Sequence, residues 1–452
     1  MTKASFFGTD GIRGISNKGN ITAEVALKLG VAAGTIFRNG NHRHLVVIGK
    51  DTRLSGYLLE PALTAGFISM GMDVLLVGPM PTPAISMLVK SLRADLGIMI
   101  SASHNTYEYN GIKIFGKTGA KLDKKTESAI EKLITEYPNN IEFSSPDTLG
   151  RATRLDDAPG RYIEFAKNTF PTDKTLNGLK IVVDSANGAS YHLAKKIFWE
   201  LGAEVIHIGN KPDGFNINKE CGSMHPEFAR DTVLSSKADI GVVLDGDADR
   251  VIIIDEKGHI IDGDKILATI ALYMKSKGKL NHNTVVATHM SNIGLEKFLH
   301  IHDIKLVRTD IGDKHVAREL ESGNYSLGGE QSGHIIIPKF SSTGDGIVAA
   351  LKILSSFVES KSKSISNLCD LYKSVPQVLH NVKYDYDKTP IAKINSIVEK
   401  ISKAEDLLQS NGGRILVRQS GTEPVVRIMI ESTDQNLTQK IISDLESEIL
   451  KV

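Results

Sequence analysis

Short apolar runs alternate with amphipathic stretches along most of the chain. The runs at residues 45–49, 73–77 and 96–100 end in polar loops, and the stretches between them have helical spacing. This alternation is typical of α/β domains, in which helices pack on a mostly parallel sheet. We therefore expect three α/β domains of related build, because the pattern recurs at residues 179–184, 204–208 and 240–244 and again at residues 284–288, 305–309 and 326–328.

The C-terminal part has a different pattern. Three apolar runs surround two helical stretches, which favours an α+β domain over a doubly wound one. A chain of 452 residues is also long enough for roughly three or four domains. The C-terminal strands are expected at residues 380–384, 413–418 and 425–431, and the domains at residues 1–155, 156–256, 257–368 and 369–452.

Three aspartates directly follow the apolar run at residues 240–244. Asp245, Asp247 and Asp249 occupy alternate positions, and in an extended segment alternate side chains share one face. Their carboxylates can therefore converge on one hard divalent cation, which prefers oxygen ligands. Arg250 beside them suits an anionic ligand such as a phosphate. The sequence predicts a cation site next to a phosphate site.

A calcium-binding EF-hand loop is the main alternative for this segment, since Glu256 falls at its twelfth position. However, the sixth position of such a loop requires glycine for a sharp turn and here holds Arg250. Residues 251–254 are apolar and typical of a buried strand. The aspartates are therefore predicted to lie on a loop between two strands. A solvated acidic turn remains the other alternative.

Two further polar segments carry candidate groups in the first domain. The run at residues 96–100 leads into Ser-Ala-Ser-His-Asn, where Ser103 is a candidate nucleophile. A hydroxyl needs a base or a prior modification, and His104, as its direct neighbour, would point to the opposite face of a strand. Near the N-terminus, glycines surround Arg13 and would let the backbone approach a ligand closely. Polar turns without a function are the alternative for both segments.

Two loops in the second half of the chain are rich in hydrogen-bonding groups. Residues 328–334 combine a carboxylate, an amide, a hydroxyl and an imidazole, which can distinguish several hydroxyl groups of a sugar. Residues 418–427 combine two hydroxyls, a glycine and flanking arginines, which suit a phosphate that is held but not transferred. This second loop lacks the lysine and spacing of a Walker loop, so it does not imply nucleotide binding.

Composition narrows the kinds of partner. The 54 basic and 53 acidic residues nearly cancel, so no broad positive field would attract a nucleic acid, and a small ligand fits better. The two cysteines, Cys221 and Cys369, are far apart and have no partners at metal-ligand spacing, which indicates a reducing compartment. The chain shows neither a signal peptide at its start nor a membrane-spanning apolar run. We expect a cytoplasmic protein without membrane or nucleic-acid partners.

Taken together in this order, the five motifs resemble those of the α-D-phosphohexomutase superfamily. They are Phe-Gly-Thr-Asp-Gly-Ile-Arg-Gly, Ser-Ala-Ser-His-Asn, Asp-Gly-Asp-Ala-Asp-Arg, Gly-Glu-Gln-Ser-Gly-His and Arg-Gln-Ser-Gly-Thr-Glu-Pro, and they span nearly the whole chain. Gln331 and the Ser-Ala-Ser-His opening favour the glucosamine branch of the superfamily. The resemblance implies three similar α/β domains with mixed sheets and a C-terminal α+β domain around a central active-site cleft.

The implied reaction interconverts glucosamine 6-phosphate and glucosamine 1-phosphate through a bisphosphate intermediate, feeding UDP-N-acetylglucosamine and cell-wall synthesis. The resemblance makes Ser103 the phosphoserine and implies that one Mg²⁺ is held by Asp245, Asp247, Asp249 and a phosphate oxygen on Ser103. Glucosamine or glucose 1,6-bisphosphate is the implied activator, and the protein is expected to be a monomer or a homodimer. Family positions around the phosphoserine match Arg13, His104, Lys113 and Arg250; those of the sugar loop match Glu330, Ser332 and His334; and those of the distal phosphate site match Arg418, Ser420, Gly421, Thr422 and Arg427.

Some points stay open at this level. Lys113 and His104 are both candidates to move the proton; other cations would lower the pKa of Lys113, whereas a phosphate would raise it. The family commonly has proline after Ser-His-Asn, but this chain has Thr106, so the rigidity of the loop is open. A phosphomannomutase or phosphoglucomutase, a Mg²⁺-dependent phosphatase with Asp245 as nucleophile, and a non-enzymatic sugar-phosphate sensor remain as rival functions.

Overall fold

The chain forms two compact units. The computed structural model describes residues 6–8, 10–385, 389–420 and 424–451. The larger unit comprises Met1–Thr288 and Val307–Asp370, and the smaller one His289–Leu306 and Leu371–Val452. Because the larger unit is compact throughout, the domain boundaries expected near residues 155 and 256 stay a prediction.

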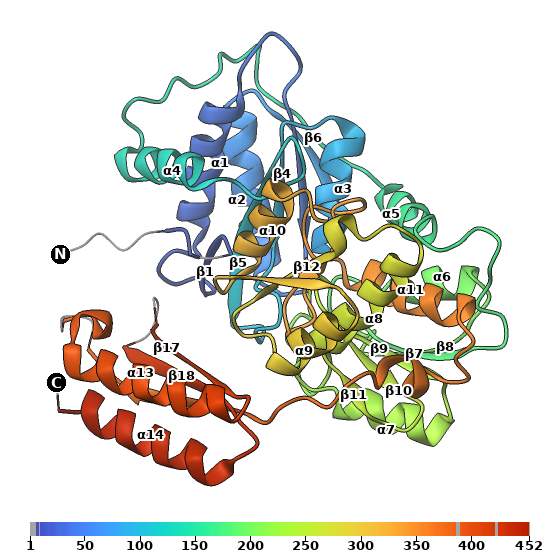
Figure 1. Ribbon diagram of the computed structural model, residues 1–452. Helices are drawn as coiled ribbons and strands as arrows, with labels where there is room; N and C mark the ends of the chain where they lie inside the picture. Colours follow the sequence, from blue (N-terminus) through green and yellow to red (C-terminus); the bar gives the residue numbers. More distant parts are fainter. Residues whose placement is uncertain (1–5, 9, 386–388, 421–423, 452) are drawn as a thin grey trace. The chain divides into compact units, whose positions relative to one another are not determined.

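A six-stranded mixed sheet forms the first part of the larger unit (Figure 1). One face packs against α1, α2 and α4, whose Leu29, Phe67 and Ile130 are fully buried in the same core as the strands. The other face packs against α3, where Ile85 lies against Gly49 of β2 and Gly97 of β4. The strand order is β1 (Ile12–Ile15), β5 (Tyr109–Gly116), β4 (Leu96–Ile100), β2 (Leu45–Lys50), β3 (Asp73–Pro79) and β6 (Ala152–Arg154); the helices are α1 (Ala23–Phe37), α2 (Gly56–Ser69), α3 (Thr82–Leu92) and α4 (Lys124–Glu136).

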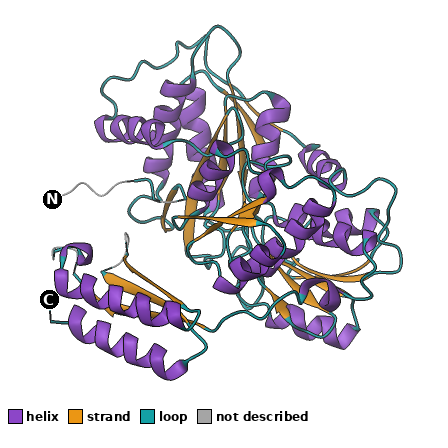
Figure 2. Cartoon of the chain, in the orientation of Figure 1, coloured by secondary structure: helices purple, strands orange, loops and turns teal. Residues whose placement is uncertain are grey.

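Two more layered sheets complete the larger unit, and the cartoon shows helices packed against each of them (Figure 2). The second sheet has the order β11 (Ile260–Ile261), β10 (Val251–Asp255), β9 (Ile240–Leu244), β7 (Lys180–Asp184) and β8 (Glu204–Ile208). In the third, β12 (Thr284–Thr288) pairs with β14 (Gly328–Gly329), which pairs with β15 (Ile335–Ile336), and β13 spans Lys305–Thr309. The helices are α5 (Ala158–Lys167), α6 (Ala194–Glu200), α7 (Glu227–Ser236), α8 (Gly263–Ser276), α10 (Asp313–Ser322), α11 (Gly346–Glu359) and α12 (Ile365–Cys369).

Each of these three sheets contains an antiparallel return; the apolar pattern predicted the strand of the second return, at residues 251–254, but not those of the other two. β4 is followed by antiparallel β5, β9 by antiparallel β10, and β14 by antiparallel β15. The connecting loops are too short for the crossover that a parallel neighbour requires. The sheets are therefore mixed rather than mostly parallel, and the expectation of three similarly built α/β domains is confirmed. The three predicted site loops are these same connections.

The smaller unit is an α+β structure, as the pattern predicted. Its three-stranded antiparallel sheet has the order β16 (Gln377–Lys383), β18 (Val425–Glu431) and β17 (Arg414–Gln419), covered by α13 (Asn395–Ser410) and α14 (Gln435–Ile449). The unit also includes α9 (Ile293–Ile301) from the middle of the chain: the buried Glu431 carboxylate accepts the Ile293 N–H, and Arg414 donates to the same carboxylate and to the Ser291 carbonyl. None of the described helices is both long and apolar enough to span a bilayer.

Most predicted strands lie within a few residues of their observed positions. The clearest differences are β16, which begins at Gln377 instead of residue 380, and β14, which is a two-residue strand at Gly328–Gly329 instead of residues 326–328. The strand β5, which starts at Tyr109, was not among the predicted strands. Its Lys113 faces the aspartate cluster and its first residues are polar, so hydrophobic alternation did not reveal the strand.

Candidate functional site

Ser103 and the three aspartates meet at the ends of adjacent layers of the larger unit. The Ser103 hydroxyl donates a 2.6 Å hydrogen bond to Asp245 Oδ2, although the two residues lie on loops of different sheets. Ser103 is almost completely buried and has a φ of +52°, a left-handed conformation that is unusual for a residue with a side chain. Such backbone strain is often found at functional positions, where surrounding contacts hold it in place.

The three carboxylates converge as predicted, but for a different reason. Residues 245–250 are not extended: they form a turn in which the Ala248 N–H donates to the Asp245 carbonyl and Ala248 has a φ of +55°. Oxygen atoms of Asp245, Asp247 and Asp249 lie within 4.8 Å of one another, and all three side chains are buried. The tight turn between β9 and β10, rather than strand alternation, brings them together.

This aspartate cluster fits a divalent cation. Burial, with the nearby Asp249 and Asp247 charges, raises the pKa of Asp245 well above its usual value. Within the described part of the chain, the buried Asp247 Oδ1 has no hydrogen-bond partner. Buried carboxylates crowded in this way need positive charge to stay ionised, and three carboxylate oxygens are ligands that Mg²⁺ accepts. Thr82 also donates to Asp247, from the start of α3.

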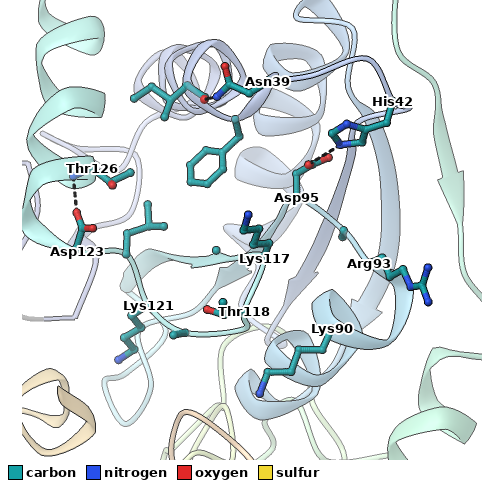
Figure 3. Close-up of a pocket in the computed structure, with 16 residues that line it drawn as sticks. Asn39, His42, Lys90, Arg93, Asp95, Lys117, Thr118, Lys121, Asp123 and Thr126 are labelled. Atoms are coloured by element: carbon teal, nitrogen blue, oxygen red, sulfur yellow. Dashed lines mark hydrogen bonds and ion pairs between the residues drawn. The ribbon is translucent and has the colours of Figure 1, made fainter. Parts of the chain in front are cut away.

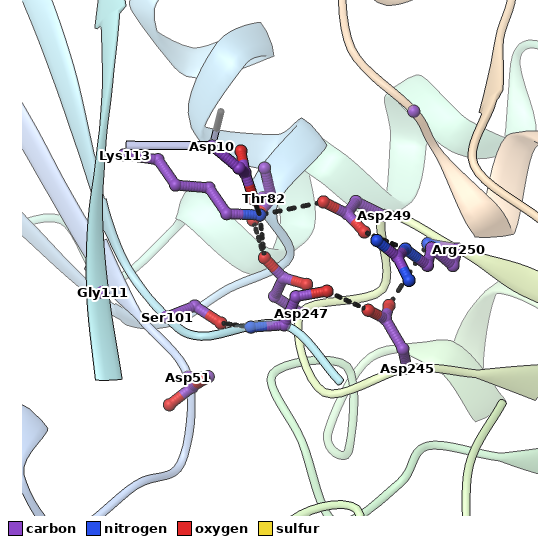
Figure 4. A network of polar contacts seen from close by, with 12 residues as sticks. Asp10, Asp51, Thr82, Ser101, Gly111, Lys113, Asp245, Asp247, Asp249 and Arg250 are labelled. Atoms are coloured by element: carbon purple, nitrogen blue, oxygen red, sulfur yellow. Dashed lines mark hydrogen bonds and ion pairs between the residues drawn. The ribbon is translucent and has the colours of Figure 1, made fainter. Parts of the chain in front are cut away.

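Lys113 on β5 supplies part of that positive charge (Figure 4). Its ammonium group lies 2.8 Å from Asp247 Oδ2, 2.9 Å from Asp249 Oδ2 and 3.3 Å from Asp10 Oδ2. Burial would lower the pKa of Lys113, but these three carboxylates outweigh it and hold the pKa well above its usual value. The lowering expected from neighbouring cations is present as a contribution of Arg13, but the three carboxylates outweigh it.

Asp10 connects the N-terminal motif to this cluster. It forms ion pairs with Arg13 and Lys121 as well as with Lys113. Burial alone would raise the pKa of Asp10, but the three cations together lower it well below the usual value. The predicted Arg13 is thus positioned at the site by a carboxylate that the motif analysis did not single out.

His104 and Arg250 complete the centre. Burial, reinforced by the positive charges of Arg250 and Arg13, lowers the pKa of His104 to about 4. The imidazole is therefore neutral at pH 7. Arg250 Nε lies 3.9 Å from Asp249 Oδ1, and the backbone N–H of Arg250 donates to Asp245 Oδ1. These groups surround the position of Ser103 with one neutral imidazole and several cations.

The predicted sugar loop lies next to the aspartate cluster. His334 is buried, with Nδ1 3.5 Å from Asp249 Oδ1 and Nε2 3.5 Å from Asp313 Oδ2. Glu330 accepts the Gly312 N–H, and the amide of Gln331 points toward Asp262 at 3.4 Å. The buried Ser332 hydroxyl makes no hydrogen bond to any described residue. The loop thus joins the metal-binding loop through His334.

The predicted distal phosphate residues belong to the smaller unit. Arg418 on β17 and Arg427 on β18 are directly opposite one another across the sheet. Burial, together with the Arg427 charge, lowers the pKa of Arg418. Two like charges at opposed positions are unfavourable by themselves, so the pair suits an anion. Ser420 is buried at the end of β17, whereas Gly421 and Thr422 lie outside the described residues.

The sequence reading missed the residues that hold the Ser103 loop. The Arg53 guanidinium is buried and donates to the carbonyls of residues 103, 105, 106 and 109 while pairing with Asp51 at 2.8 Å. The Asn218 amide donates to two of the same carbonyls, at 2.8 Å each. These contacts fix the loop although Thr106 replaces the usual proline. Asp51 and Arg53 directly follow the carboxyl end of β2, where α/β sheets place functional residues; this position in the sequence was the signal that could have predicted their role.

Comparison with known proteins agrees with this geometry. Residues 4–140, 160–258, 262–375 and 379–447 match, in order, the α/β/α domains I, II and III and the C-terminal domain of phosphoglucomutase/phosphomannomutase. The chain is 52% identical over 445 residues to a phosphoglucosamine mutase of Parvibaculum lavamentivorans and 51% identical over 448 residues to one of Rhodospirillum rubrum; both alignments cover 98% of each chain.

A solved structure extends the similarity to three dimensions. A phosphoglucomutase/phosphomannomutase family protein from Burkholderia thailandensis superimposes with a TM-score of 0.82 at 25% identity, covering 99% of this chain and 97% of that one. The resemblance inferred from the five motifs is thereby confirmed. The chain belongs to the phosphoglucomutase/phosphomannomutase family.

Proposed function

We propose that the protein catalyses the phosphoglucosamine mutase reaction, the interconversion of glucosamine 6-phosphate and glucosamine 1-phosphate. The observation that carries the proposal is the 2.6 Å contact of the buried Ser103 hydroxyl with Asp245 at the centre of the aspartate cluster. Relatives with 51–52% identity over nearly the whole chain carry the same activity in their names. The substrate is a small phosphosugar.

In the proposed reaction, Ser103 carries a phosphoryl group. The bond between phosphorus and Ser103 Oγ breaks as a new bond forms to a sugar hydroxyl oxygen, giving glucosamine 1,6-bisphosphate. The other phosphate of this bisphosphate then returns to Ser103, so the numbers of phosphoryl groups on enzyme and sugar are restored. Glucosamine or glucose 1,6-bisphosphate would load an unphosphorylated enzyme by the reverse of the first half-reaction.

Charge neutralisation is the main task of the surrounding residues, because phosphoryl transfer depends on positioning and electrostatic stabilisation. Asp245, Asp247 and Asp249, with a phosphate oxygen on Ser103, would hold one Mg²⁺. Bound Mg²⁺ supplies positive charge to the phosphoryl oxygens during transfer. Arg13 and Arg250 add guanidinium donors around the same group.

The electrostatics favour His104 over Lys113 as the group that accepts the sugar hydroxyl proton. A pKa of about 4 leaves the His104 imidazole neutral and able to accept. Lys113 instead stays protonated among Asp10, Asp247 and Asp249. Lys113 then acts as a fixed positive charge. The negative charge of a phosphate on Ser103 would raise the pKa of His104 toward neutrality, which improves its match to this role.

The remaining predicted residues would bind the sugar and the distal phosphate. Glu330, Ser332 and His334 would contact the sugar, and the unsatisfied Ser332 hydroxyl supports that role. The opposed Arg418 and Arg427, with Ser420, Gly421 and Thr422, would hold the phosphate that is not being transferred.

The test is Ser103→Ala together with a comparison of substrates. Intact-mass analysis of the bisphosphate-treated protein should show a phosphate-sized addition that Ser103→Ala lacks, and the variant should have no mutase activity. Ser101→Ala, on the same loop, is the matched control for the phosphate addition. Phosphate found instead on Asp245, labile to hydroxylamine, would favour the phosphatase. A clear preference for glucose or mannose 6-phosphate over glucosamine 6-phosphate would overturn the choice of sugar.

A further inference from the structure

A second cluster of metal-ligand side chains lies at the other end of the first sheet. His42 and His44 are alternate residues leading into β2, and Asp95 directly precedes β4. β2 and β4 are parallel neighbours, and their first backbone contact is made by Leu45 and Asp95. The Asp95 N–H donates to the Leu45 carbonyl, and the Leu45 N–H donates to Asp95 Oδ2, each at 2.9 Å. The carboxylate is therefore held in a fixed position beside the two histidines.

The three side chains have the spacing of a metal site. His42 Nε2 lies 2.9 Å from Asp95 Oδ1, and His44 Nδ1 lies 3.5 Å from Asp95 Oδ2. One donor atom from each residue falls within 4.8 Å of the others. Bonds of about 2.0–2.1 Å in a tetrahedral zinc site separate neighbouring ligand atoms by roughly 3.3 Å. Small side-chain rotations would bring all three donors to that separation.

His44 gives an independent reason to expect a ligand. Its side chain is only 8% exposed, and its Nδ1 atom makes no hydrogen bond to a described residue; the Asp95 carboxylate, 3.5 Å away, is an ion-pair contact only. An unsatisfied buried nitrogen costs free energy that a bound cation would remove. A surface hydrogen bond between His42 and Asp95 explains those two residues, but it leaves His44 Nδ1 with only the 3.5 Å contact to Asp95 Oδ2. The two imidazole rings also lie only 4.2 Å apart, which places both of them beside the same carboxylate.

We propose that His42, His44 and Asp95 form a binding site for a divalent transition-metal ion of the zinc class. Two imidazoles and one carboxylate suit zinc and its neighbours better than magnesium, which prefers oxygen ligands. His42 and Asp95 lie on the wall of a cavity of about 780 Å³, from which a water or an anion supplies the fourth ligand (Figure 3). Lys90, Arg93 and Lys117 also line this cavity; they favour an anionic fourth ligand and weaken binding of the free cation.

This site is separate from the aspartate cluster. Asp95 precedes β4, whereas Ser103 follows it, and the five residues of β4 span roughly 17 Å at about 3.3 Å each. The metal would join the starts of β2 and β4 and would not contact the phosphoryl group. Its expected effect is to stabilise the first domain, while mutase activity in Mg²⁺ stays unchanged by its loss.

The test uses full-length protein without a polyhistidine tag, stripped with a chelator and then kept in excess Mg²⁺ so that the aspartate cluster is saturated. Zinc bound after gel filtration is measured for the wild type, His42→Ala and Asp95→Asn, with the exposed His225→Ala as the matched control. We expect the first two variants to lose a zinc equivalent that the wild type and His225→Ala retain. Cobalt should give the visible absorption of a tetrahedral site in the wild type and His225→Ala, and not in His42→Ala or Asp95→Asn.

His42 is half exposed, so its removal does not threaten folding, and mutase activity of His42→Ala confirms that the variant is native. Equal zinc stoichiometry in all four proteins, or a cobalt spectrum unaffected by His42→Ala, would overturn the proposal. Zinc lost equally from His225→Ala would also overturn it, because binding would then be a property of surface histidines in general.

Discussion

Replacing Arg53 by lysine tests whether the Ser103 loop is held by a single guanidinium. The side chain contacts no predicted substrate group, yet it donates to Asp51 and to four backbone carbonyls of residues 103–109. A guanidinium has five N–H donors in a fixed plane, whereas an ammonium has three. The carbonyls of residues 103 and 105 keep the Asn218 amide as a donor, so the acceptors that lysine leaves unsatisfied are the carbonyls of residues 106 and 109.

The expected losses follow from that count. Each unsatisfied buried acceptor costs about 1–3 kcal/mol, so two cost about 2–6 kcal/mol of folding free energy. The left-handed backbone of Ser103, which costs roughly 1–2 kcal/mol for a residue with a side chain, would relax once these contacts weaken. A displacement of about 1 Å at a reacting group can reduce kcat by about 100-fold. KM should change little, because the sugar loop does not contact Arg53.

The assay measures kcat and KM for glucosamine 6-phosphate and the midpoint of thermal unfolding. Ser103 phosphorylation is matched between proteins by intact mass. Arg43→Lys is the control, because Arg43 is exposed and its one ion pair within the described part of the chain is with Asp73; it should leave both quantities unchanged. Wild-type kcat in a folded Arg53→Lys protein would refute the reasoning. So would a fall in kcat that merely equals the unfolded fraction, since Arg53 would then stabilise the domain without positioning Ser103.

Two further predictions concern the neighbouring loops. Lys113→Met leaves the carboxylates of Asp10, Asp247 and Asp249 without their buried ammonium, so we expect a loss of about 3–5 kcal/mol of folding free energy. Mg²⁺ should then stabilise the variant more than the wild type, measured as the shift in unfolding temperature. Equal Mg²⁺ shifts in the two proteins would contradict this prediction. Gly333→Ala places a Cβ 2.0 Å from the Val251 carbonyl oxygen at a φ of +87°, so the sugar loop must move and KM for glucosamine 6-phosphate should rise. Gly160→Ala, where a Cβ meets nothing within 4 Å, is the control, and an unchanged KM for Gly333→Ala would show that the loop does not position the sugar.

The sequence located the chemistry without locating all of the structure that supports it. Apolar runs marked the parallel strands, since buried strands leave a strong local signal, and the loops after those runs held Ser103, the three aspartates and His334. Of the antiparallel returns, β10 was visible as an apolar run, whereas β5 and β15 were not. β5 begins with Tyr109, Asn110 and Gly111 and directs Lys113 to the aspartate cluster, so it contains no continuous apolar run.

The sequence by itself determined which residues carry the function and in what order their loops occur, because motif spacing and residue type are properties of the chain. The tertiary structure decided the positions, the pKa values and the supporting contacts of these residues. The aspartates converge through a turn, the pKa of Lys113 rises because three carboxylates from separate segments surround it, and Ser103 is held by Arg53 and Asn218. These are contacts between residues from about 50 to more than 100 positions apart in the chain. Local pattern carries no information about such contacts, and burial gives them their strength.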